Sequence, residues 1–389
     1  MYYCNHDLFN PPLMGIAGRT FTNTCLECLN LSSYNYLGFA DSQGPCTDAV
    51  KDCIQRHGMG IVTSQLDAGS LAIHLQLESI VAHFVGAKSA MCTSMGFATN
   101  SNTIPALVGK ESLIVSDELN HSSIVFGMGV SEATIRVCKH NNIKDLETVL
   151  HDAISQGQPC NCGLWKKILV IVKGLSMEGR AAQSQYTVDL KKKYKFFLYV
   201  NKAHSMCALG PYGCGICDVM GIDPAKDVDV MMGTFTKSFG SAGGCIAGKK
   251  TIIDNLQTQA LSHVYGEPIS PPMAQQIILS ICITMGEDGT TDGQDRIARL
   301  WDNSTVLRNK LKRMGFIVYR DEETPVLPAF SRECLDRGIV VVVVGHLATP
   351  TVSCRVRFCI SVSHSREDIE NLNRDPAKEL GDKLGLKVS

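Results

Sequence analysis

Short apolar runs alternate with longer amphipathic stretches through the middle of the chain. The runs are of strand length and fall at residues 112–115, 134–137, 168–172, 197–200 and 228–232. Between residues 71 and 84 apolar side chains recur at helical spacing instead. Strands that alternate with helices predict a mostly parallel sheet with helices on both faces, which is an α/β fold.

The pattern divides the chain into three parts. Residues 1–60 are expected to form an N-terminal arm of short elements, with turn-forming residues at 10–12 and 15–18. Residues 61–265 carry the alternating pattern of the large domain. Residues 266–389 are expected to form a smaller α/β domain, with a helix after Ser270-Pro271-Pro272, a helix near 297–314 and a strand at 340–344.

Composition excludes several classes of protein. The 389 residues carry a net charge of -1, so there is no basic footprint for nucleic acid. The 17 cysteines lack paired zinc-site spacing, and no signal peptide is recognisable, so we expect no metal site and the reduced thiols of an intracellular protein. No apolar stretch approaches the ~20 residues of a membrane span, so we expect a soluble chain or one held at a membrane by a partner.

One lysine stands among glycines and small hydroxyl residues. Lys237 lies in Gly-Thr-Phe-Thr-Lys-Ser-Phe-Gly, directly after the apolar run at 228–232. A lysine amine forms a Schiff base with the aldehyde of pyridoxal 5′-phosphate (PLP). Neighbouring hydroxyls can hold the phosphate, and glycines let the backbone approach it. Taken alone, the segment is more typical of a polar loop after a strand, and the rest of the chain decides between the two interpretations.

Several further segments occur in the order found in one enzyme family. They are residues 33–39 (SYNYLGF), 95–101 (MGFATNS), 117–121 (DELNH), 203–205 (AHS), the Lys237 run, 340–345 (VVVVVG) and 355–358 (RVRF). With them, residues from about 10 to 387 resemble the α-oxoamine synthase family of fold-type I PLP enzymes, and within it the catalytic long-chain-base subunits. The resemblance implies a large PLP-binding domain with a smaller C-terminal domain.

The resemblance also assigns roles to individual residues. The backbone amides of Gly96 and Phe97 and the hydroxyls of Thr234 and Thr236 are implied to hold the phosphate, and Lys237 the aldehyde. His121 is implied to stack on the pyridine ring, and His204 to lie near the phenolic oxygen. Arg357, or alternatively Arg355, is implied to bind the carboxylate of the amino-acid substrate, because a guanidinium fork suits a carboxylate.

The chain departs from the family pattern at several of these places. Asn201 stands where the family has the aspartate that keeps the pyridine nitrogen protonated, and an amide carries no charge to do this. Five other positions also differ, namely Lys202 and Lys173 for glutamates, Gln65 for an arginine, and Glu267-Pro268 for a Thr-Ser pair from the neighbouring subunit. The segment before Ser176 is one residue short. About ten residues of the family pattern are missing between Pro328 and Arg332.

The resemblance implies condensation of L-serine with a long-chain acyl-CoA to 3-ketosphinganine at the cytosolic face of the endoplasmic reticulum. A homodimer is implied, or a heterodimer with a first-subunit-like chain. The departures lead us to expect impaired activity. Three alternatives stay open at this point: an active acyltransferase, a non-catalytic subunit, and a decayed copy.

Overall fold

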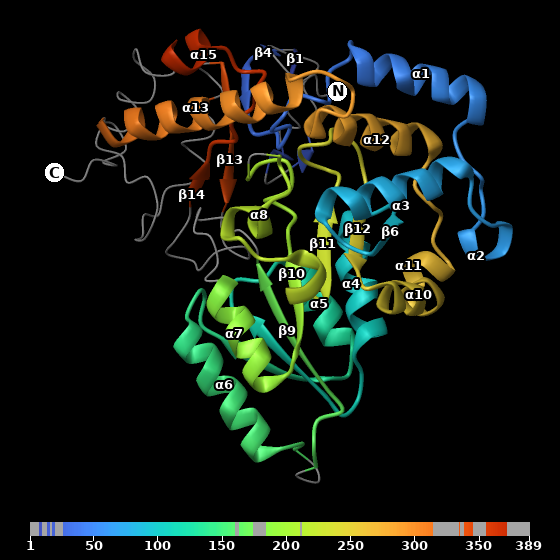
Figure 1. Ribbon diagram of the computed structural model, residues 1–389. Helices are drawn as coiled ribbons and strands as arrows, with labels where there is room; N and C mark the ends of the chain where they lie inside the picture. The colour runs from blue at the N-terminus through green and yellow to red at the C-terminus, as the bar shows by residue number, and fades with distance from the viewer. Residues whose placement is uncertain are drawn as a thin grey trace. The chain divides into compact units, whose positions relative to one another are not determined.

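The computed structural model describes residues 8–9, 14–15, 18–19, 26–159, 163–173, 184–210, 212–313, 334, 338–344 and 355–371 (Figure 1). By its internal contacts the chain forms two compact units. The larger is Pro45–Gln294, and the smaller joins Met1–Gly44 to Asp295–Ser389. Two departures from the family pattern lie outside the described residues: the shortened segment before Ser176 and the missing residues between Pro328 and Arg332.

A seven-stranded sheet forms the centre of the larger unit. Its strands are β6 (Ser89–Thr93), β7 (Ser112–Asp117), β8 (Thr134–Cys138), β9 (Lys167–Lys173), β10 (Phe197–Asn201), β11 (Val230–Thr234) and β12 (Gly244–Gly248), in the order β6-β12-β11-β10-β9-β7-β8. The pairs from β8 through to β11 are parallel, and β12 runs antiparallel to β11 and β6. The predicted mostly parallel α/β fold is therefore confirmed, although β11 begins two residues later than expected.

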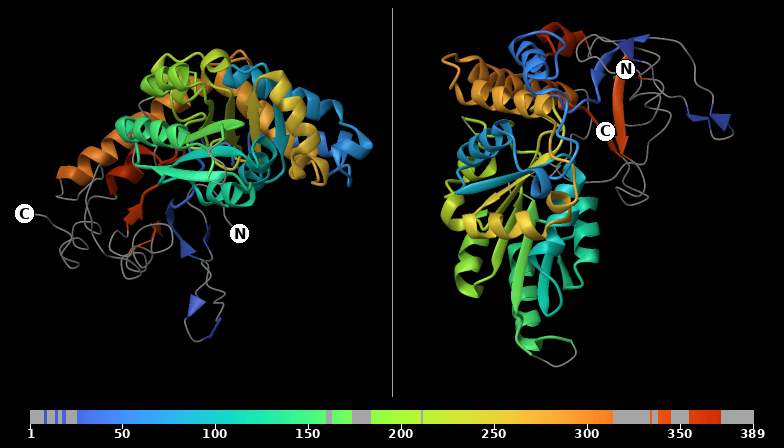
Figure 2. Two further views of the ribbon diagram at one scale, coloured as in Figure 1. Left: turned by 90° about the horizontal axis from the view of Figure 1, so that it is seen from below. Right: turned by 90° about the vertical axis from the view of Figure 1, so that its right-hand side faces the viewer.

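Helices cover both faces of this sheet (Figures 1 and 2). On one face, Ile114, Ile171 and Tyr199 belong to a buried cluster with residues of α4 (Gly96–Leu107), α5 (Ser122–Val130) and α10 (Lys250–Gln259). We call this the α4 face. Because alternate strand residues point to opposite sides, Leu198 and Val200 point to the other face, with α7 (Ser184–Tyr194) and α8 (Ile216–Met220). We call that the α8 face.

The remaining helices of the larger unit enclose these layers. The predicted helix at 71–84 is α3 (Ala72–Val85), which ends at a left-handed Gly86. α3 and α1 (Pro45–His57) both pack on α12 (Pro271–Met285), and α6 (Ile143–Gln156) lies beside α7 (Figure 1). Shorter helices complete the unit: α2 (Gln65–Ala68), α9 (Pro224–Asp227) and α11 (Leu261–Val264).

The smaller unit has its own sheet, in the order β14-β13-β5. β13 (Ile339–Val344) pairs in parallel with β5 (Leu29–Leu31) and antiparallel with β14 (Arg355–Arg357). In the part of this unit that the structure describes, the helices are α13 (Asp292–Arg313), whose first residues belong to the larger unit, and α15 (Arg366–Asn371). Two-residue strands form two further pairs, β1 (Leu8–Phe9) with β4 (Leu26–Glu27) and β2 (Met14–Gly15) with β3 (Gly18–Arg19).

The internal contacts place the boundaries of the larger unit between residues 44 and 45 and between residues 294 and 295. The sequence pattern predicts domain boundaries between residues 60 and 61 and between residues 265 and 266. The difference has a physical cause at each end. α1 packs on α12, which draws both helices into the larger unit, and β5 pairs with β13, which draws the start of the chain to its C-terminal part.

Two sequence expectations concern the chain as a whole. Among the described helices, none combines the length and apolar character required to cross a bilayer. The twelve cysteines that the structure describes are free thiols, and ten of them are buried. Burial raises the pKa of the thiols of Cys92, Cys207 and Cys245, because a thiolate is costly to form away from water.

Gly244 offers a test of the packing of β12. A Cβ at this position would lie 2.6 Å from Thr99 Oγ1 and 2.8 Å from the Gly233 carbonyl oxygen. Gly244→Ala is therefore expected to lower the free energy of unfolding by about 1–3 kcal/mol through overpacking. Urea unfolding followed by circular dichroism measures this. Gly129→Ala is the matched control, since a Cβ there meets no heavy atom within 4 Å, and equal effects of the two substitutions would contradict the packing account.

Candidate active site

Lys237 lies where parallel strands end. It follows β11 by three residues, and its half-buried Nζ donates a hydrogen bond to the Ala203 carbonyl at 3.2 Å. Ala203 in turn follows the end of β10, the parallel neighbour of β11. The carboxyl ends of parallel strands are where ligands bind in open α/β sheets. The lysine amine is thus positioned at the edge of the sheet where a site is expected.

A narrow cradle lies next to this lysine. Gly96 is the first residue of the 12-residue helix α4, and a Cβ built on it would lie 2.9 Å from Thr234 Oγ1 and 3.3 Å from the Gly243 carbonyl oxygen. Thr234 Oγ1 lies 2.9 Å from Thr236 Oγ1. Glycine is required at 96 because any side chain would fill the cradle. Helix amides and two hydroxyls meet here, which is the donor set that a phosphate needs.

A hydrogen-bonded network fixes His121 on the α4 face. The Tyr199 hydroxyl donates to Asn100 Oδ1 at 2.7 Å, and Asn100 Nδ2 donates to Ser123 Oγ at 2.9 Å. Ser123 Oγ lies 2.8 Å from His121 Nδ1, which also accepts the Ser123 backbone N–H at 3.2 Å. Because a backbone N–H always donates, Nδ1 is the acceptor nitrogen of the ring. The His121 imidazole is therefore held neutral, with Phe97 edge-on to it at 6.5 Å.

Charges around His121 also favour the neutral form of its ring. Partial burial, and then the ammonium groups of Lys237 and Lys173, lower the pKa of His121. Lys173 Nζ donates a hydrogen bond to the Leu119 carbonyl. The Asp117 carboxylate, at the end of β7, already accepts hydrogen bonds from His140 and from the Leu119 N–H. Burial opposes the ionisation of Asp117, but these hydrogen bonds outweigh it, so the pKa of Asp117 is lowered. The site is therefore rich in cations.

Asn201 is the last residue of β10, and its side chain is buried on the α4 face. Its Oδ1 accepts the Ala203 backbone N–H at 3.0 Å. Its register partner on β9 is Lys173, so the two side chains leave neighbouring strands on the same face. The position expected to carry the family's aspartate thus carries an amide beside a cation.

Lys202 follows immediately and is almost fully buried, with 1% of its surface exposed. Its side chain lies on the α8 face, where Nζ is 4.0 Å from Met231 Sδ. Lys202 therefore does not share a face of the sheet with Asn201. Lys173, the register partner of Asn201 on β9, does. No carboxylate is paired with Lys202 among the residues that the structure describes.

Three other residues from the sequence analysis lie in the larger unit. His204 is half-buried in the turn after β10. Gln65 begins α2, and its Nε2 donates to Ser70 Oγ at 3.1 Å. Glu267 is exposed, and its backbone carbonyl accepts a hydrogen bond from Ser94 Oγ at 2.8 Å. Since Ser94 directly precedes the start of α4, the Glu267 backbone lies beside the entrance to the cradle.

Arg357 belongs to the smaller unit, on the edge strand β14. Its guanidinium donates to the Tyr34 hydroxyl and lies 5.6 Å from the centre of that ring. Ser361 Oγ donates to the Asn35 carbonyl at 2.6 Å. The structure therefore brings together two segments that the sequence marked separately, residues 33–39 and 355–358. The backbone of Arg355 pairs with Val344.

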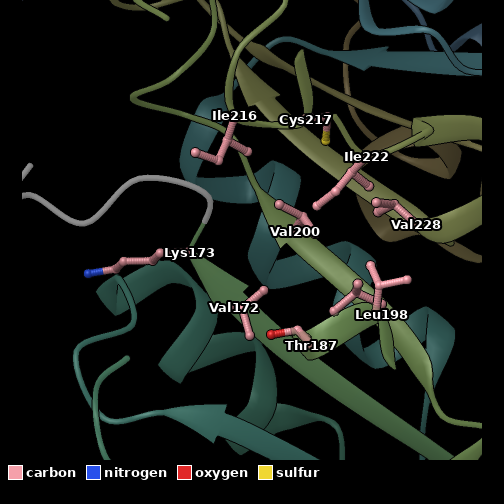
Figure 3. Close-up of a pocket in the computed structure, with 10 residues that line it drawn as sticks. Val172, Lys173, Thr187, Leu198, Val200, Ile216, Cys217, Ile222 and Val228 are labelled. Carbon is pink, nitrogen blue, oxygen red and sulfur yellow. The ribbon is translucent and has the colours of Figure 1, made fainter. Parts of the chain in front are cut away.

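A small apolar pocket lies away from the lysine, on the α8 face (Figure 3). Val172, Leu198, Val200 and Ile222 line it, and the Lys173 side chain points away from them. Its lining is mostly hydrocarbon, and besides Lys173 the Thr187 hydroxyl and the Cys217 thiol are its polar groups. We regard it as a packing gap between β10 and α8 rather than as part of the lysine site.

The parallel sheet, the lysine at its carboxyl edge and the helix N-terminus beside it define a fold-type I transferase. The family model "Aminotransferase class I and II" matches residues 27–374. Long chain base biosynthesis protein 2b of Oryza sativa subsp. japonica is 47% identical, over 94% of this chain and 75% of its own length. Serine palmitoyltransferase 3 of Homo sapiens is 46% identical, over 93% and 67%. The chain belongs to the aminotransferase class I and II family, in the group of serine palmitoyltransferases and long chain base biosynthesis proteins.

Solved structures agree with this placement. A serine palmitoyltransferase of Sphingomonas wittichii superposes with a TM-score of 0.83 at 26% identity, covering 93% of this chain and 89% of its own. A high-resolution structure of a serine palmitoyltransferase with PLP gives a TM-score of 0.83 at 24% identity, covering 92% and 88%, and so supports the fold. The predicted resemblance and fold class are confirmed.

Lys202 generates a prediction about stability. A buried ammonium without a carboxylate partner carries a desolvation cost, and replacing buried charge with an apolar side chain of similar volume often stabilises by about 1–4 kcal/mol. Lys202→Met is expected to raise the free energy of unfolding accordingly. Urea denaturation of the protein without added ligand is the measurement, with Lys144→Met on exposed α6 as the control. A destabilised Lys202→Met protein would show that the ammonium has a stabilising partner.

A second prediction concerns the charge on His121. Removing the Lys173 ammonium removes a cation that disfavours the imidazolium, so Lys173→Gln is expected to raise the pKa of His121. NMR titration of the histidine ring signals measures it, with Lys144→Gln as a control of equal charge change. An unaltered His121 titration in Lys173→Gln would place the two groups too far apart to interact.

Proposed function

We propose that this chain is a serine palmitoyltransferase-like acyltransferase of sphingolipid synthesis that binds PLP through Lys237 and has impaired activity. The observation that carries the proposal is that two side chains bind the backbone of one residue, Ala203. One is the amine of Lys237, which suits the aldehyde of the cofactor. The other is the amide of Asn201, which does not suit a protonated ring nitrogen. The names and identity of the relatives support the substrate class, L-serine and a long-chain acyl-CoA.

The residues of the site suit the phosphate and the aldehyde of PLP but not a protonated ring nitrogen. The cradle of Gly96, Thr234 and Thr236 offers amides and hydroxyls for a phosphate, and Lys237 offers an amine for the aldehyde. Phe97, at the start of α4, would add a second backbone amide. No carboxylate stands at the end of β10 to pair with a protonated ring nitrogen, because Asn201 occupies that place.

When bound, PLP withdraws charge from the α-carbon of an amino acid. The chain's own residues would do the remaining work. Lys237 Nζ would take and return the α-proton of serine, since its amine is held at the site by the Ala203 carbonyl. The neutral His121 ring would pack on the cofactor face, and His204 would lie near its phenolic oxygen. Arg357, or Arg355, remains the predicted ligand of the serine carboxylate.

Four features favour impaired over full activity. Asn201 lacks the charge of an aspartate, Lys173 adds a cation next to it, and Lys202 leaves a charge buried on the other side of the sheet. Glu267 replaces a residue that, in the resembled family, helps to hold the phosphate of the neighbouring subunit's site, and a carboxylate there would repel a phosphate. The same features favour the second candidate function, a non-catalytic subunit that retains the fold.

The partners remain predictions. We expect a homodimer, or a heterodimer with a serine palmitoyltransferase subunit 1-like chain, because in the resembled family the segment at 265–272 completes the site of the neighbouring subunit. The predicted location is the cytosolic face of the endoplasmic reticulum. Sedimentation of the chain alone and with such a partner distinguishes these assemblies.

Cofactor binding is the test of the proposed function. PLP added to the purified chain is expected to give a visible absorption band, and borohydride reduction should fix the cofactor to the peptide that contains Lys237. Lys237→Ala should abolish both signals, because the amine that forms the Schiff base is removed. Absorbance titration and peptide mass spectrometry are the measurements.

Activity is read separately, from the exchange of the serine α-proton followed by NMR at saturating PLP. The native chain should exchange slowly and Asn201→Asp faster, because the ring would regain its counter-charge. Lys144→Ala controls for loss of a lysine elsewhere. PLP binding that survives Lys237→Ala unchanged would overturn the assignment of the lysine, and absence of exchange in every variant would favour the non-catalytic subunit.

A further inference from the structure

Asn201 does more than lack a charge, because its amide is held in one orientation. The Ala203 backbone N–H can only donate, so the Asn201 atom that faces it at 3.0 Å must be the carbonyl oxygen, Oδ1. The other end of the amide, Nδ2, is then directed away from that N–H. Among the residues that the structure describes, none accepts a hydrogen bond from Nδ2. The residue is only 8% exposed, and Nδ2 is not one of the fully buried atoms that lack a partner, so this donor is accessible to a partner that enters the site.

The amide and the lysine share one anchor. Lys237 Nζ donates to the carbonyl of Ala203, and Asn201 accepts from the N–H of the same residue. Asn201 also lies on the α4 face, like Tyr199 two residues before it, whose hydroxyl reaches α4. The unused donor therefore belongs to the face that carries the lysine and the cradle.

The charges facing this position are positive or already paired. Lys173 is the register partner of Asn201 on β9, and Lys237 lies at Ala203. His121 has a lowered pKa and an acceptor nitrogen at Nδ1. On β7, the Asp117 carboxylate is hydrogen-bonded to the His140 ring at 2.8 Å, and the Glu118 carboxylate accepts the His140 N–H at 2.8 Å. None of these groups would favour a second cation beside Asn201.

From this geometry we infer that the site binds PLP with its ring nitrogen unprotonated, as the acceptor of a hydrogen bond from Asn201 Nδ2. The inference rests on the proposed function and deepens it. A protonated pyridine nitrogen is a donor and would face the Nδ2 donor with no acceptor between them. An unprotonated nitrogen satisfies the buried amide and avoids the Lys173 ammonium. A ring bound in this form withdraws less charge, so the site is built for holding the cofactor more than for forming a carbanion.

Two forms of the cofactor distinguish this inference from the proposed function. The first is PLP. The second is PLP methylated on the ring nitrogen, which carries a fixed positive charge there and cannot accept a hydrogen bond. The native chain is expected to bind the methylated form about 10–100-fold more weakly, the scale of leaving a buried donor unsatisfied. Asn201→Asp should reduce or reverse that preference, since a carboxylate attracts the fixed charge.

The matched control is Asn142→Asp. Asn142 caps α6, its side chain accepts the Asp145 N–H at 3.1 Å, and an aspartate serves equally well as an N-cap there. Dissociation constants come from absorbance titration at one salt concentration. The ¹⁵N chemical shift of ring-labelled PLP on the native chain gives a second measurement that does not depend on any variant folding. It is expected at the value of an unprotonated pyridine.

The outcomes separate cleanly. Equal binding of the two forms to the native chain, or a ¹⁵N shift typical of a pyridinium, would overturn the inference and leave the proposed function in place. Failure of the native chain to bind either form would overturn both. A preference for PLP that persists unchanged in Asn201→Asp would show that another group, and not the amide, selects the form of the ring.

Discussion

The backbone of Ala203 is the point on which the site depends. The backbone of this one turn residue binds the amine of Lys237 through its carbonyl oxygen and the amide of Asn201 through its N–H. The two side chains come from segments well separated in sequence, and only the parallel pairing of β10 with β11 brings the segments together. Any change that moves this turn would shift both groups at once, so the geometry of the site is set by the end of the sheet rather than by either side chain.

The electrostatics of the site follow from that arrangement. Neighbouring positions at the ends of β9 and β10 carry Lys173 and Asn201, and the next residue, Lys202, carries its charge to the opposite face. The neutral imidazole of His121 fits these surroundings, because its network with Ser123, Asn100 and Tyr199 assigns Nδ1 the role of acceptor. The cation-rich character is therefore distributed over three elements and not confined to a single substitution.

Much of this architecture could be predicted from the sequence. Strand-length apolar runs and the helical spacing of 71–84 predicted α3 and five of the seven strands of the central sheet, all but β6 and β12, since local periodicity reports burial directly. The position of Lys237 shortly after a strand of this sheet, β11, was also predicted. The roles of the individual site residues remain predictions.

The hydrophobic pattern of the sequence did not reveal two features of the structure. Tyr199 was interpreted only as an apolar strand residue, although a buried tyrosine hydroxyl requires a partner and could have signalled the network to Asn100. The assignment of α1 to the larger unit and of β5 to the smaller one depends on packing between distant segments, which no local window contains.

The pairing of β5 with β13 has a consequence for synthesis of the chain. Leu29–Leu31 are synthesised before the whole of the larger unit, and their parallel partner strand, Ile339–Val344, only after it. Until that strand is made, the earlier segment lacks its partner, while the larger unit can complete its own layers first. A nascent chain would therefore carry an unpaired strand edge while the larger unit is translated, a state prone to association with other chains. The topology therefore sets the order of assembly, in which the sheet of the smaller unit forms after the larger unit.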